Sequence, residues 1–71
     1  MFELKGERVR HGYTSQELGR MIGVSKQSYG QKERGIRKFT DDEKVKLVSL
    51  LGLSYHQFNE IFFDGKLPWT I

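Results

Sequence analysis

Residues 14–35 read TSQELGRMIGVSKQSYGQKERG, and this stretch decides the fold. Thr14 followed three residues later by Glu17 is a capping box, a signal that begins a helix. Gly23 can take the left-handed conformation that ends a helix, and Ser25 can cap a second helix. Two short helices joined by a three-residue turn have the layout of a helix-turn-helix.

The same start and stop signals recur on both sides of this stretch. Thr40 with Glu43 and Ser54 with Gln57 repeat the capping box. The sequence therefore predicts an all-α fold of five helices, near residues 3–11, 15–22, 26–34, 41–51 and 55–63. It also predicts a helix-turn-helix domain over residues 1–63 and a C-terminal tail over residues 64–71.

The second helix of the motif carries several side chains that can donate and accept hydrogen bonds. Because the sixth position of a helix lies about one turn after the second and third, we expect positions one, two, three and six to form a set that suits base edges in a major groove. The set comprises Lys26, Gln27, Ser28 and Gln31. Gly19 provides a small residue where the two helices of the motif approach each other.

Charge is distributed unevenly along the 71 residues, which carry a net charge of +3. Residues 1–38 hold nine basic and four acidic side chains, whereas residues 39–71 hold three basic and five acidic ones. The basic residues around the third helix predict a surface that follows nucleic-acid phosphates. Among them we expect Lys32, Arg37 and Lys38 to hold phosphates.

Several segments together resemble the Cro and phage-repressor (XRE) family of helix-turn-helix proteins over about residues 3–63. These segments are residues 4–14 with Glu17 and Leu18, then residues 22–25, 33–35, 51–54 and 60–63. The resemblance implies a five-helix, lambda-repressor-like fold that binds DNA through its third helix. It also implies a structural ion pair between Arg8 and Glu33.

Three positions depart from the pattern of this family. Ser15 stands where a phosphate-binding Gln usually follows the cap, so we assign this contact to Ser15 together with Gln16. Lys32 stands where an apolar residue is common. Gly30 interrupts the third helix at a cost of about 1 kcal/mol relative to Ala, and two interpretations stay open: close approach of a partner, or simple tolerance.

Aromatic residues are abundant for so small a core, with nine in the chain and five in the last 17 positions. They predict either a protein interface or a tail that folds back so that Trp69 covers the core. The residues that we assign to such an interface are Tyr29, Tyr55, Phe58, Phe62 and Trp69.

These features lead to two hypotheses for a cytoplasmic protein that is neither an enzyme nor a membrane protein. The first is a small phage or prophage transcription regulator that binds double-stranded operator DNA. The alternative is an antirepressor that inactivates a phage repressor through protein contacts of the helix-turn-helix and the aromatic surface. Either could act as a homodimer or heterodimer, and we expect no cofactor, metal or small-molecule ligand.

Overall fold

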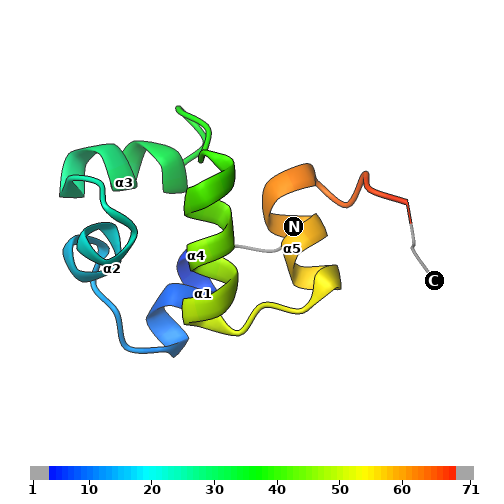
Figure 1. The fold of residues 1–71 in the computed structure, drawn as a ribbon, viewed down its shortest axis with the longest axis horizontal. Coiled ribbons are helices and arrows are strands. Elements are labelled where there is room, and N and C mark those ends of the chain that lie inside the picture. Colours follow the sequence, from blue (N-terminus) through cyan, green and yellow to red (C-terminus); the bar gives the residue numbers. More distant parts are fainter. Residues whose placement is uncertain (1–3, 69–71) are drawn as a thin grey trace.

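A computed structural model describes residues 4–68, and within them it contains five helices and no strand (Figure 1). The all-α prediction is confirmed, and each helix boundary lies within one residue of its expected position. The helices are α1 (Leu4–Arg10), α2 (Ser15–Ile22), α3 (Lys26–Glu33), α4 (Asp41–Leu51) and α5 (Tyr55–Phe63).

Local hydrogen bonds explain why the helices begin where the sequence predicts. The Thr14 hydroxyl accepts the Glu17 N–H at 3.0 Å, and the Glu17 carboxylate accepts the Thr14 N–H at 2.9 Å. The same reciprocal pair forms at Thr40 and at Ser54, while the Ser25 hydroxyl caps α3 without a returning acid. All three predicted capping boxes are therefore present.

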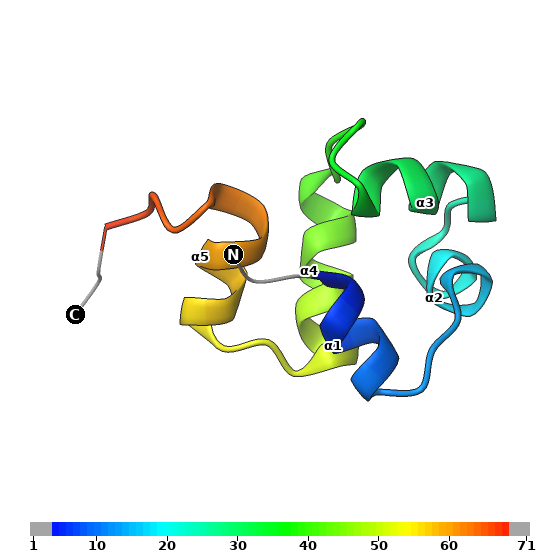
Figure 2. The same ribbon diagram turned by 180° about the vertical axis from the view of Figure 1, so that it is seen from behind.

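Helix α4 stands in the middle of the molecule, with α1, α2 and α3 on one side and α5 on the other (Figures 1 and 2). The core forms where α2, α3 and α4 meet. Its largest fully buried side chains are Leu18, Tyr29, Leu47 and Leu51. Burial of this apolar surface, together with the caps, holds the motif against α4.

Phe39 connects α5 to the rest of the core. Its ring meets the rings of Tyr29 from α3 and Phe62 from α5 at centroid distances of 6.0 and 5.7 Å, both edge-to-face. Edge-to-face rings attract each other beyond the area that they bury. Phe39 therefore joins α3 to α5 from the loop between α3 and α4.

The tail turns back along α5 at Asp64, which takes the left-handed conformation with φ of 53°. The side-chain amide of Asn59 then donates to the Leu67 carbonyl and accepts the Leu67 N–H. The Tyr55 hydroxyl donates to the Pro68 carbonyl at 2.7 Å. Side chains of α5 thus hold the tail at Leu67 and Pro68.

Gly19 lies at the closest approach of α2 and α3, as the sequence predicts. A Cβ at this position would lie 3.1 Å from the Cβ of Tyr29 and 3.2 Å from the Val24 carbonyl oxygen. Neither atom belongs to a flexible side-chain end, so the two helices would have to separate. At Gly30, by contrast, a Cβ would meet only the end of the flexible Arg34 side chain.

We therefore expect opposite effects from adding the same methyl group at two mid-helix glycines. Gly19→Ala should destabilise the protein by about 1–2 kcal/mol, because overpacking outweighs the gain in helix propensity. Gly30→Ala should stabilise it by up to about 1 kcal/mol. Urea unfolding followed by circular dichroism measures both, and an unchanged midpoint for Gly19→Ala would contradict the close packing.

Candidate nucleic-acid interface

The orientation of α3 follows from its two buried residues, Tyr29 and Lys32. They lie three positions apart and therefore share one side of the helix. The opposite side faces solvent. By helical spacing it carries a stripe at i, i+3, i+4 and i+7, which we call the outer stripe: Gln27, Gly30, Gln31 and Arg34.

Side chains of the outer stripe and its flanks are available for a ligand. Gln27 and Lys26 are exposed, and Gln31 and Ser28 are half-buried. Within residues 4–68, none of these four side chains has a hydrogen bond or ion pair. The structure thus brings Gln27 and Gln31 together on the outward side and places Lys26 and Ser28 beside them.

The predicted phosphate contacts fall at two places around the motif. Ser15 and Gln16 occupy the first turn of α2, where free backbone N–H groups and the helix dipole favour an anion. Arg37 and Lys38 are exposed on the loop between α3 and α4. The arrangement can hold a polyanion whose charges flank α3.

The prediction that Lys32 holds a phosphate is wrong, because its ammonium is engaged inside the protein. Its side chain is 7% exposed, and its ammonium donates to both oxygens of Glu43 at 2.7 and 2.9 Å. Burial alone would raise the pKa of Glu43, but hydrogen bonds from Lys32 and from the Thr40 N–H outweigh it, so this pKa is lowered. Lys32 therefore ties α3 to the start of α4 in place of an apolar residue.

The ion pair between Arg8 and Glu33 is present, as the resemblance implied. Arg8 Nε and Nη2 donate to the two carboxylate oxygens at 2.8 and 3.2 Å, and Nη1 donates to the Tyr13 carbonyl. The hydrogen bond and charge of Glu33 raise the pKa of Arg8 despite burial. The pair joins α1 to α3, and it lies on the side of the helix-turn-helix that faces the rest of the protein.

Tyr29 is fully buried, which corrects its assignment to a protein interface. Its hydroxyl donates to Glu33 at 2.7 Å. Burial, then this hydrogen bond, raises the pKa of Tyr29. The phenol is thus a neutral third member of the network of Arg8 and Glu33.

Three of the other predicted interface aromatics, Tyr55, Phe58 and Phe62, belong to α5, which lies across α4 from α3 (Figure 1). Tyr55 is 39% exposed, and Phe62 packs against Phe39. Phe58 is half-buried and helps to line an apolar groove of about 320 Å³ between α4 and α5. Trp69 lies outside the described residues.

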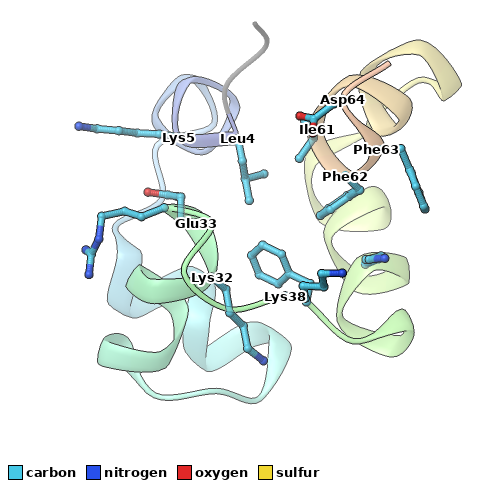
Figure 3. Close-up of a pocket in the computed structure, with 13 residues that line it drawn as sticks. Leu4, Lys5, Lys32, Glu33, Lys38, Ile61, Phe62, Phe63 and Asp64 are labelled. Carbon is cyan, nitrogen blue, oxygen red and sulfur yellow. The ribbon is translucent and has the colours of Figure 1, made fainter. Parts of the chain in front are cut away.

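A larger groove of about 720 Å³ separates α1 and the end of α3 from α5. Figure 3 shows Leu4 and Phe62 extending into it from opposite walls, while Lys5 points away. The carboxylate and ammonium on its α3 wall, Glu33 and Lys32, are already engaged in the two ion pairs. The acid and base on the α3 wall of this groove are therefore not free to act on a ligand.

Two further properties concern the described residues, 4–68. They contain no group of three or more metal-ligating side chains. None of their helices has both the length and the apolar character needed to span a membrane.

Comparison with known proteins agrees with this geometry. A family model described as Helix-turn-helix matches residues 4–58, a range that contains α1 to α4, the motif and the beginning of α5. No curated protein and no solved structure matches the chain significantly.

Proposed function

We propose that this chain, which belongs to the Cro and phage-repressor (XRE) family of DNA-binding helix-turn-helix regulators, controls transcription in a phage or prophage genetic switch. It would do so by placing α3 in the major groove of double-stranded operator DNA. The antirepressor alternative draws no support from α3, because the aromatic residue of this helix is buried rather than presented to a partner.

The observation that carries the proposal is the outer stripe of α3. Side-chain amides such as those of Gln27 and Gln31 can donate and accept at once, which suits the paired donor and acceptor of an adenine edge. Both lack partners within the described chain. A helix whose outward amides are unsatisfied loses no internal hydrogen bond when it enters the groove.

Phosphate contacts supply the rest of the binding energy. We assign them to Ser15 and Gln16 at the start of α2 and to Arg37 and Lys38 on the loop between α3 and α4. Each neutralised phosphate releases counterions, so affinity falls as salt rises. A dimer would bind two half-sites separated by about 34 Å, or a multiple of this distance.

The proposal is tested by selecting duplexes from a random pool with the purified full chain at low salt. We expect a defined sequence to be enriched and the logarithm of its affinity to decrease linearly with the logarithm of salt concentration. Gln27→Ala with Gln31→Ala should abolish the enrichment while the circular dichroism spectrum stays unchanged. If the unaltered chain enriches no sequence at about 50 mM salt, it does not read operator DNA.

Two matched lysine variants distinguish a direct phosphate contact from the effect of the net charge of the protein on DNA binding. Lys38→Ala should reduce the salt slope by about one unit. Lys66→Ala removes the same charge from the tail beyond α5, on the far side of α4 from α3, and should leave the slope unchanged (Figure 1).

A further inference from the structure

Gly30 and Arg34 occupy successive turns of the outer stripe and lie against each other. Arg34 is the C-cap of α3, still helical with φ of −83°, and its N–H donates to the Gly30 carbonyl. A Cβ at position 30 would lie 3.3 Å from Arg34 Nη1. The guanidinium therefore rests on the part of α3 that has no side chain.

This placement brings the guanidinium back by one turn toward the start of α3. Long side chains on helices generally extend over the preceding turn, and the missing side chain at Gly30 lets this one lie flat. Its end thus lies against Gly30, which belongs to the outer stripe. Within residues 4–68, the side chain of Arg34 has no hydrogen bond or ion pair, whereas the neighbouring Glu33 turns inward to Arg8.

We infer that Arg34, seated on Gly30, reads a guanine in the major groove and so determines part of the sequence specificity. The inference rests on the proposed function and extends it by one residue and one base type. A guanidinium presents two parallel N–H donors that match the O6 and N7 acceptors of guanine, a contact that no other base edge offers in the same form.

The position of the guanidinium favours a base over a phosphate. The cations assigned to phosphates, Arg37 and Lys38, lie outside the helix, on the loop after α3. The end of Arg34 instead lies against Gly30 on the outward side of α3, the side that would face the bases in the major groove. The same arrangement explains why position 30 is a glycine, because a longer side chain there would occupy the space of the guanidinium.

The experiment compares Arg34→Ala and Arg34→Lys with the unaltered chain, using the duplex selected above and its single-base variants. We expect one guanine in the selected site to be preferred by about 10- to 100-fold. Arg34→Ala should lose this preference, and Arg34→Lys should weaken it, since lysine keeps the charge but not the planar pair of donors. Arg34→Lys should keep the salt slope of the unaltered chain.

Variants at Gly30 test the seat of the guanidinium. In the unaltered chain, Gly30→Leu should remove the guanine preference, because leucine displaces the guanidinium. In a chain that already carries Arg34→Ala, Gly30→Leu should not change the base preference any further. A steric clash of leucine with DNA would weaken binding in both backgrounds. Circular dichroism confirms in each case that the helices remain formed.

Two outcomes would overturn the inference and differ from each other. If Arg34→Ala retains the guanine preference, or weakens all duplexes equally and reduces the salt slope by about one unit, Arg34 does not read a base and the proposed function stands. If the unaltered chain selects no sequence, the proposed function fails and the inference fails with it.

Discussion

Replacing Glu33 by alanine is expected to lower the free energy of unfolding by about 3–5 kcal/mol, because it leaves a buried charge without its partner. The carboxylate of Glu33 accepts three hydrogen bonds, two from Arg8 and one from Tyr29. The side chains of the ion pair are each only 10% exposed, so water cannot easily replace the lost acceptor. A domain of this length has a total stability of about 4–10 kcal/mol.

Urea unfolding at neutral pH, followed by circular dichroism, measures this loss. Asp42→Ala is the matched control, because it removes an exposed carboxylate and should cost no more than about 1 kcal/mol through the helix dipole. Combining Arg8→Met with Glu33→Gln should restore much of the stability, since the charge is removed and Tyr29 keeps an acceptor. A loss below about 1 kcal/mol for Glu33→Ala would mean that the pair behaves as an exposed one.

The second large effect is expected at the ion pair of Lys32 and Glu43. Glu43→Ala should cost about 3–5 kcal/mol, because the ammonium of Lys32, 7% exposed, loses its only acceptors within the described residues. The same change removes half of the capping box of α4. Lys32→Met should cost much less, because Glu43 keeps the Thr40 N–H and the favourable end of the helix dipole.

The same pair predicts a dependence of stability on pH. Since the folded protein holds the pKa of Glu43 below its usual value, its contribution is fully present above the unfolded pKa of about 4.3. It is lost as the pH falls through the lowered pKa of the folded state. Lys32→Met removes the largest cause of the lowering, so the stability of this variant should fall less steeply in acid. An identical acid profile for both proteins would contradict the role of the pair.

The helix boundaries were predictable because the signals that determine them are local. Thr14, Thr40 and Ser54 each cap the helix that follows through a residue three positions later, so no knowledge of the tertiary structure is needed. The pair of Arg8 and Glu33, 25 positions apart, is different. Nothing in their spacing predicts the contact, and only the resemblance to a family implied it.

The side of α3 that is buried was harder to predict from the sequence than the helix boundaries. Its only large apolar residue is Tyr29, so the apolar periodicity that orients a helix is almost absent. Lys32 lies three positions later on the same side, but a lysine ordinarily indicates solvent. Lys32 can be buried because Glu43 neutralises its charge. In the sequence, Glu43 is already explained by its role in the capping box of α4, so nothing there indicates a second role as the partner of Lys32.

For Arg34, the sequence indicates the charge but not the contact that positions it. Its place in the basic cluster around α3 was evident from the sequence, but its relation to Gly30 was not. A glycine inside a helix is compatible with close approach of a partner or with tolerance. The structure adds a third explanation, in which the space above Gly30 is filled by the chain's own guanidinium.

Phe39 has a consequence for regulation that follows from its position. Its ring is the one on which Phe62 of α5 packs, and it directly follows Lys38 in the loop beside α3. If a ligand or second subunit shifted α5, and the ring and the cation next to it moved too, thermodynamic linkage would require DNA that fixes the loop to alter the affinity of α5 for that ligand by the same factor.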